Sequence, residues 1–160
     1  MYSLNVPVPP AVSKLARGLA AETFGSSVRD RHTLVVKRLG EKSPERLAPV
    51  VRDVIAGTAP FQLRIDGIGS FAEPTTGRGP VVYLRVDSPA LEALHRRLCD
   101  RFGAIDGLEG DEYVPHVTIA RGGNADRLIG RDVTTEWTAD WLVLWTGRYD
   151  EPVERISLPA

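Results

Sequence analysis

The chain has 160 residues, of which 42% are hydrophobic and 26% charged, an ordinary balance for a globular protein. Its 20 Lys and Arg against 21 Asp and Glu give a formal charge of −1, which excludes the strongly basic surface of a protein that coats nucleic-acid backbone. A single cysteine excludes an internal disulfide. No stretch has the roughly 20 apolar residues of a membrane span, so we expect a soluble cytoplasmic protein with no membrane contact.

Strand and helix signals alternate along the chain. β-branched and apolar runs predict strands, and apolar residues at a spacing of three and four behind a proline predict helices. The predicted strands are 2–8, 31–39, 61–68, 81–86, 113–120, 141–146 and 153–158. The predicted helices are 9–24, a segment that ends at 57, and 89–102, with a short helix or turn at 124–130. Pro49 removes a backbone donor, so the helix that ends at 57 is expected to be regular only from Leu47.

The two halves of the chain repeat one order of elements. Each half has a strand, a helix that opens with a proline, and a strand that carries histidine and threonine. The histidines are His32 in the first half and His116 in the second. A duplication of this kind places two histidines across a pseudo-two-fold axis, where one can donate a proton and the other can accept one.

The segment 113–121 carries the clearest chemical pattern. Side chains alternate along a strand, so His116 and Thr118 are expected to project from the same face. A phosphodiester needs a proton taken from the attacking oxygen, a proton given to the leaving oxygen, and donors to the other phosphate oxygens. Histidine serves either proton role near neutral pH, and threonine is a neutral donor. Alternation places Arg121 on the opposite face from His116, unless the glycines that follow it bend the chain.

An isolated histidine-x-threonine pattern is more often part of a packed sheet, and the surrounding sequence changes this interpretation. The residues HVTIAR at 116–121 resemble the second signature of the two-histidine (2H) phosphoesterases, which include 2′-5′ RNA ligase-like proteins and RNA 2′,3′-cyclic phosphodiesterases. The residues GIGSF at 67–71, PVVYL at 80–84 and the helix around 91–98 are similar to the middle of that family. The resemblance covers most of residues 2–146.

The resemblance implies a fold of the α+β class with duplicated antiparallel sheets, outer helices and a central cleft. We expect a single domain, 1–160, with lobes at roughly 1–68 and 80–146 whose strands can interleave. The family reaction uses neither metal nor cofactor, because two histidines exchange the acid and base roles while threonines hold the phosphate. We expect a monomeric enzyme. Its expected substrate is a 2′,3′-cyclic phosphate end of RNA or an oligonucleotide, or a small cyclic nucleotide, opened to a 2′-phosphate.

The first signature departs from the family pattern, because His32 comes directly before Thr33. Neighbours on a regular strand face opposite ways. Either Arg31 takes the place of the histidine, where it would bind phosphate without acting as a base, or a β-bulge turns His32 and Thr33 to one face. We favour the bulge; the alternative is a non-catalytic binder of phosphorylated RNA ends or nucleotides. The predicted site comprises the catalytic pair His116 and His32 and the phosphate-binding residues Thr118, Thr33, Arg31 and Arg121.

Other features are expected to serve the fold. His95 lies beside the apolar stripe of its helix and is expected to pack there. Trp137, Trp141 and Trp145 have the spacing of one strand face, where core packing is favoured over base stacking. The acidic residues at 106–112 lack the spacing of a calcium loop and are expected to form a solvated loop.

Overall fold

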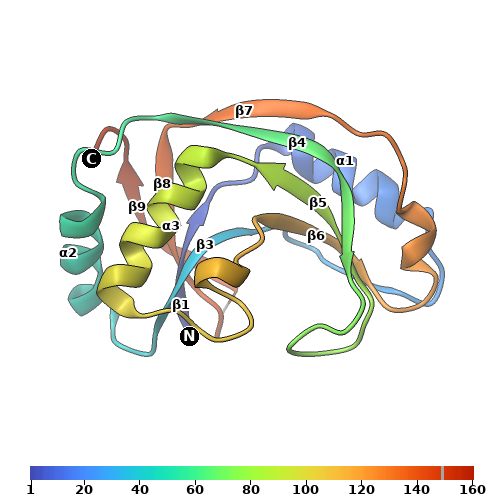
Figure 1. Ribbon diagram of the computed structural model, residues 1–160, viewed down its shortest axis with the longest axis horizontal. Coiled ribbons are helices and arrows are strands. Elements are labelled where there is room, and N and C mark those ends of the chain that lie inside the picture. Colours follow the sequence, from blue (N-terminus) through green and yellow to red (C-terminus); the bar gives the residue numbers. More distant parts are fainter. Residues whose placement is uncertain (149) are drawn as a thin grey trace.

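The computed structural model describes residues 1–148 and 150–160, which form two antiparallel sheets and three α-helices (Figure 1). The strands are β1 (Tyr2–Val6), β2 (Ser27–Val28), β3 (Leu34–Gly40), β4 (Phe61–Phe71), β5 (Val81–Asp87), β6 (His116–Arg121), β7 (Thr135–Ala139), β8 (Trp141–Thr146) and β9 (Glu151–Ser157). The helices are α1 (Pro10–Ala20), α2 (Pro44–Ile55) and α3 (Pro89–Phe102), with 3₁₀ turns η1 (Gly110–Glu112) and η2 (Ala125–Leu128).

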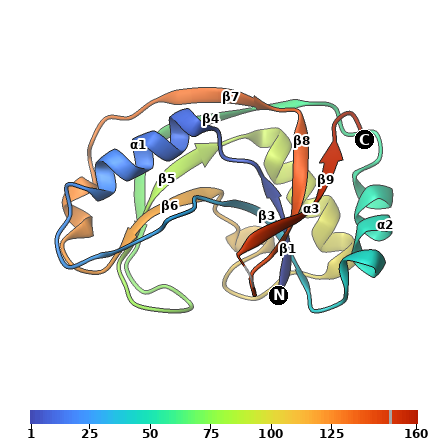
Figure 2. The same ribbon diagram turned by 180° about the vertical axis from the view of Figure 1, so that it is seen from behind.

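Each sheet combines strands from distant parts of the chain. The four-stranded sheet has the order β3-β1-β8-β9, and the five-stranded sheet has the order β2-β6-β5-β4-β7. All their strand pairs are antiparallel. Both sheets are curved, and the helices lie on their outer sides (Figures 1 and 2). The predicted fold class, duplicated antiparallel sheets with outer helices, is therefore confirmed.

The helices close the outer sides because each has one apolar stripe to bury. α1 packs against β6, α3 packs against β3 and β4, and α2 packs against α3 and β9. No helix within 1–148 or 150–160 is long and apolar enough to cross a membrane.

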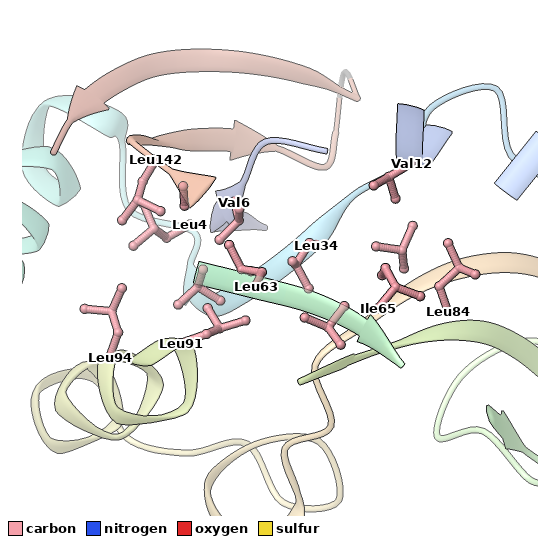
Figure 3. Close-up of a cluster of buried hydrophobic side chains, with 14 of the residues drawn as sticks. Leu4, Val6, Val12, Leu34, Leu63, Ile65, Leu84, Leu91, Leu94 and Leu142 are labelled. Carbon is pink, nitrogen blue, oxygen red and sulfur yellow. The ribbon is translucent and has the colours of Figure 1, made fainter. Parts of the chain in front are cut away.

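One continuous core joins the two sheets and the helices (Figure 3). Leu4 and Leu142 come from the four-stranded sheet, Leu63 and Leu84 from the five-stranded sheet, and Leu91 from α3. All five are almost completely buried. Burying a leucine side chain stabilises a fold by about 1.5–3 kcal/mol, so this shared core holds the two sheets in a fixed relation.

The prediction that α2 is regular only from Leu47 is wrong. The helix begins at Pro44 and contains Pro49. Leu47, Val51 and Ile55 are buried along one side of it. Their burial keeps the helix continuous despite the donor that the proline removes.

Several strand boundaries also differ from the predicted ones. The strand predicted at 31–39 begins only at Leu34, and the strand predicted at 113–120 begins at His116. The strand β7 (Thr135–Ala139) was not predicted, because only part of it is apolar and its place at the sheet edge leaves alternate residues exposed. These shifts matter at the first histidine, since residues 31–33 precede β3.

Candidate active site

A cavity of about 440 Å³, called here the His116 cavity, is lined by residues from both sheets. β3 contributes Val35 and Arg38, and β6 contributes His116 and Arg121. The loop between β4 and β5 and the segment between α3 and β6 complete the lining, and both extend on the same side of the molecule (Figure 1). The cavity thus collects one imidazole, the guanidinium groups of Arg38 and Arg121, and two carboxylates, those of Glu73 and Glu112.

His116 is held in one orientation by a backbone hydrogen bond and two rings. Its Nδ1 lies 2.7 Å from the carbonyl oxygen of Val114. Because a carbonyl only accepts, Nδ1 carries the proton and Nε2 presents a lone pair. The ring stands edge-on to Phe71 and tilted against Tyr83, with centroid distances of 5.2 Å in both cases. The imidazole is therefore prepared to accept a proton at Nε2.

Burial lowers the pKa of His116 below its usual value, and the nearby charges of Arg38, Arg29 and Arg121 lower it further. The hydrogen bond to Val114 opposes this shift only in part. The imidazole is consequently neutral near pH 7, which is the state that a general base requires.

Arg121 faces the His116 cavity because β6 contains an irregularity. In the pairing of β5 with β6, Val82 lies opposite Ala120 but Tyr83 lies opposite Thr118, so Ile119 is an extra residue. A bulge of this kind re-aims the side chains that follow it. The expected opposite facing of Arg121 is therefore wrong, and the cause is the bulge itself. Its guanidinium also donates to the carbonyl oxygen of Thr76 at 2.9 Å, which ties the β4–β5 loop to the cavity.

Arg29 and Arg38 were missed as site residues by sequence reasoning. Arg29 follows β2, which pairs with β6, and its charge lowers the pKa of both His32 and His116. Arg38 lies on β3, where its side chain reaches the His116 cavity. Neither residue belongs to a recognisable motif, because their place depends on which strands pair. With Arg121, they make this part of the molecule suitable for a phosphate.

Thr118, predicted to share the phosphate with His116, is 7% exposed and lies opposite Tyr83 in the sheet. It is not part of the lining of the His116 cavity, whereas Arg121 is. His116 lies opposite Arg85, two residues from Tyr83, so Thr118 and His116 project from the same face as predicted, while Arg121 reaches the cavity wall.

The residues of the first histidine motif line a second cavity, of about 290 Å³. Arg31, His32 and Thr33 all line this cavity. They precede Leu34, the first residue of β3, so the predicted β-bulge is not what turns His32 and Thr33 to one side. The Nδ1 atom of His32 is buried without a hydrogen-bond partner. Burial lowers the pKa of His32, and the charges of Arg17 and Arg29 add to this effect. The structure does not bring His32 into the His116 cavity.

Both cavities open on one face of the four-stranded sheet. Asn5 of β1 lies directly opposite Val35 of β3 on one side and Val143 of β8 on the other. Residues directly opposite in antiparallel strands project from the same face. Val35 lines the His116 cavity, while Asn5 and Val143 line the second cavity. A ligand lying across β1 can therefore reach both.

The remaining motifs follow the expectations to different extents. Trp137 lies on β7 of the five-stranded sheet, whereas Trp141 and Trp145 lie on β8 and line the second cavity, so the three do not share a face. In the acidic loop, Asp106, Asp111 and Glu112 are exposed as expected, but Glu109 is only 3% exposed. His95 packs as expected, with Nδ1 donating to the carbonyl oxygen of Val36 at 2.7 Å.

Comparison with known proteins agrees with this architecture. The family described as the 2′-5′ RNA ligase superfamily matches residues 32–150. A protein of Methanothermobacter thermautotrophicus named RNA 2′,3′-cyclic phosphodiesterase is 37% identical over 84 residues, which are 52% of this chain and 45% of that protein. The match thus spans less than half the length of that relative.

Two solved structures show how far the fold is shared. The protein TT0787 of Thermus thermophilus superposes with a TM-score of 0.68 at 22% identity, covering 98% of this chain and 97% of that one. Escherichia coli LigT complexed with 3′-AMP has a TM-score of 0.68 at 18% identity, covering 99% and 98%. At these identities the likeness is one of fold.

Proposed function

The chain belongs to the 2′-5′ RNA ligase superfamily, and from this premise we propose that it is a phosphodiesterase that opens 2′,3′-cyclic phosphates at the ends of RNA or oligonucleotides. The observation that carries the proposal is the state of His116. Its Nδ1 is committed to Val114, its Nε2 is available, and its pKa is lowered by burial. A neutral imidazole in one cavity with Arg38 and Arg121 combines a base with cations that match phosphate oxygens.

In the proposed reaction a water molecule attacks the phosphorus atom of the cyclic phosphate. Nε2 of His116 takes one proton from that water as the new P–O bond forms. The bond between phosphorus and the 3′ oxygen breaks, the phosphate stays on the 2′ oxygen, and the released 3′ oxygen takes a proton from solvent. Arg38 and Arg121 stabilise the negative charge that grows on the non-bridging oxygens.

This assignment rests on His116 alone. The family pattern implied a second proton carrier at His32, but β3 contributes Val35 and Arg38 to the His116 cavity and His32 lines the neighbouring one. An arginine stays protonated and cannot act as a base. We therefore propose proton transfer by His116 and ligand contact, rather than proton transfer, by His32.

A second candidate function is non-catalytic binding of phosphorylated RNA ends or nucleotides. His32 and His116 line different cavities, which favours this function because two-histidine chemistry requires both imidazoles at one phosphorus atom. Under this alternative, Arg38 and Arg121 hold the phosphate and no bond breaks.

Turnover of an oligonucleotide that ends in a 2′,3′-cyclic phosphate distinguishes these functions. We expect the purified protein to form the 2′-phosphate, and His116→Asn to lower kcat by at least about a hundredfold, the usual contribution of a positioned base. The asparagine side-chain N–H can still donate to Val114, so the fold and the melting temperature are expected to be retained. Arg64→Gln, on the exposed side of β4, serves as a matched control. Retention of the oligonucleotide without product supports the binding function, and full activity in His116→Asn contradicts the proposed mechanism.

A further inference from the structure

A third cavity, of about 420 Å³, lies between the first turn of α2 and the end of α3. It is called here the Arg46 groove, and its lining includes Leu39, Lys42, Arg46, Leu47, Arg101 and Phe102. We propose that it binds the RNA strand on the 5′ side of the cyclic phosphate, so that the protein prefers oligonucleotides to mononucleotides. The inference rests on the proposed function for the identity of the strand, whereas the groove is defined by its own residues.

The rim of the Arg46 groove carries an excess of positive charge. Lys42, Arg46 and Arg101 are exposed, and none of them takes part in the ion pairs formed within the described part of the chain. Glu41 is the only carboxylate among the described lining residues, and it pairs with the amino group of Met1 at 2.8 Å. Unpaired cations on one rim repel one another, so an anionic ligand stabilises this surface. An RNA backbone supplies one negative charge per nucleotide.

The floor of the Arg46 groove is apolar. Leu39 and Leu47 are buried, and Phe102 packs against the same core. The guanidinium of Arg101 lies 5.9 Å from the ring centroid of Phe102, so a cation and an aromatic ring stand side by side. Sites for single-stranded nucleic acid combine these two features, cations along the backbone and aromatic or apolar side chains beneath the bases. The groove therefore suits a nucleotide better than an inorganic anion, which has no apolar surface to bury.

The Arg46 groove adjoins the His116 cavity. Met1 lines the His116 cavity, and its Sδ atom accepts the backbone N–H of Gly40, which lines the groove, at 3.2 Å. On the other side, Phe102 lines the groove and Ile105, three residues later, lines the cavity. The N-terminus, the connection between β3 and α2 and the end of α3 lie on one side of the molecule (Figures 1 and 2). A strand that leaves the His116 cavity past Met1 can therefore enter the groove.

An acidic peptide is the other occupant that these charges fit. The shared boundary with the His116 cavity favours the RNA strand, because its cyclic phosphate is already held next to the groove. Binding of the following nucleotides is then an intramolecular step, which adds affinity without a second encounter. A mononucleotide cannot make this second contact, and its affinity is expected to be lower.

Steady-state kinetics on cytidine 2′,3′-cyclic phosphate and on longer oligocytidylates with the same end test the proposal. We expect KM to fall by about tenfold from the mononucleotide to the tetranucleotide at low salt. Arg46→Gln/Arg101→Gln is expected to remove this difference by raising KM for the tetranucleotide alone, with little change in kcat. Lys14→Gln/Arg127→Gln removes the same charge from exposed residues outside the lining of the groove, and is expected to leave the difference in place.

The salt dependence of binding measures the phosphate contacts themselves. For a single strand, each contact contributes about 0.7 to the slope of log affinity against log salt concentration, so Arg46→Gln/Arg101→Gln is expected to lower the slope by about 1.4. An octacytidylate that carries fluorescein at its 5′ end and a cyclic phosphate at its 3′ end serves as the probe. A slope that stays the same in this double variant would show that Arg46 and Arg101 do not contact the strand.

Direct binding separates this inference from the proposed reaction. In the His116→Asn background, fluorescence anisotropy of labelled cytidylates reports binding without turnover. If affinity rises with length and falls in the double variant, while the unmodified protein shows no hydrolysis, the proposed function fails and the strand site stands. If hydrolysis occurs with the same KM at every length, the strand site is overturned. Length-independent RNA binding, together with a labelled peptide rich in Glu and Leu that binds the unmodified protein but not the double variant, also overturns it.

Discussion

Lys37 and Glu109 form a buried ion pair behind the His116 cavity, with Nζ and Oε1 2.7 Å apart and both side chains almost fully enclosed. The same carboxylate accepts the backbone N–H groups of Arg38 at 2.9 Å and Ile105 at 3.0 Å. It therefore links β3, at Arg38, to the segment between α3 and β6, and both of these line the His116 cavity. Burial raises the pKa of Glu109, but the hydrogen bonds from Lys37, Arg38 and Ile105 outweigh it and leave the pKa below its usual value.

Glu109→Gln is expected to destabilise the protein by about 3–5 kcal/mol, because it leaves the ammonium of Lys37 buried without a counter-charge. The free energy of unfolding in urea measures this loss. Asp87→Asn is the matched control, since it breaks an exposed pair with Arg64 and is expected to cost less than about 1 kcal/mol. Equal effects of the two substitutions would show that the buried pair has no special role in stability.

Acidification is expected to destabilise the fold between pH 7 and pH 5. Burial is the largest cause lowering the pKa of His32, His95 and His116, so each binds its proton more weakly in the folded state than in the unfolded chain. Their full contribution is present above the unfolded value of about 6.5 and is lost as pH falls toward the folded values. The contribution of Glu109 is fully present in this range and is lost only below the unfolded carboxyl value of 4.5, because its pKa is lowered in the fold.

Urea unfolding at pH 7.5, 6.0 and 5.0 measures this dependence. The His32→Asn variant is expected to show a smaller change with pH, since one of the three titrating imidazoles is removed. A free energy of unfolding that stays constant or rises on acidification would contradict the buried, neutral state of the histidines.

The sequence predicted the main elements of the fold because prolines and glycines mark where elements begin and end. Pro89 begins α3 and Gly103 ends it, and the alternation around His116 correctly indicated a strand. His95 was expected to pack because of its position on the apolar side of α3, and it does. Local patterns of this kind need no knowledge of which strands pair.

The site was less predictable, because tertiary pairing places its residues. The bulge at Ile119, which turns Arg121 toward His116, exists only in the pairing of β6 with β5. The local sequence around Glu109 is typical of a solvated loop. Its burial depends on a contact with Lys37, which lies 72 positions earlier in the chain. Neither arrangement has a periodic signal in the sequence.

The pH profile of hydrolysis is expected to rise and then level off on the acid side of neutrality. His116 must be deprotonated to act as a base, and burial lowers its pKa, so the midpoint of the acid limb of kcat/KM is expected below pH 6.5. Arg38→Gln removes a cation that lowers this pKa and is expected to move the acid limb to higher pH, while also raising KM. Arg64→Gln, remote from the cavity, is expected to leave the acid limb in place. An unchanged profile in Arg38→Gln would show that Arg38 does not lower the pKa of His116.

Gly69→Ala is expected to lower kcat, because it displaces a ring that positions His116. A Cβ atom at Gly69 would lie 2.7 Å from the hydroxyl of Tyr83 and 2.8 Å from its ring carbons, so the ring must move. That ring contacts His116, and displacing it changes the direction of Nε2. A misplaced catalytic group can cost about a hundredfold in rate.

Gly18→Ala provides the contrast, because nothing lies within 4 Å of a Cβ at this position in α1. It is expected to stabilise the protein by about 0.5–1 kcal/mol through helix propensity and to leave kcat unchanged. Measuring kcat and the melting temperature for both variants separates a local effect on the imidazole from a general loss of stability. If Gly69→Ala retains the kcat of the unmodified protein, then Tyr83 does not position His116.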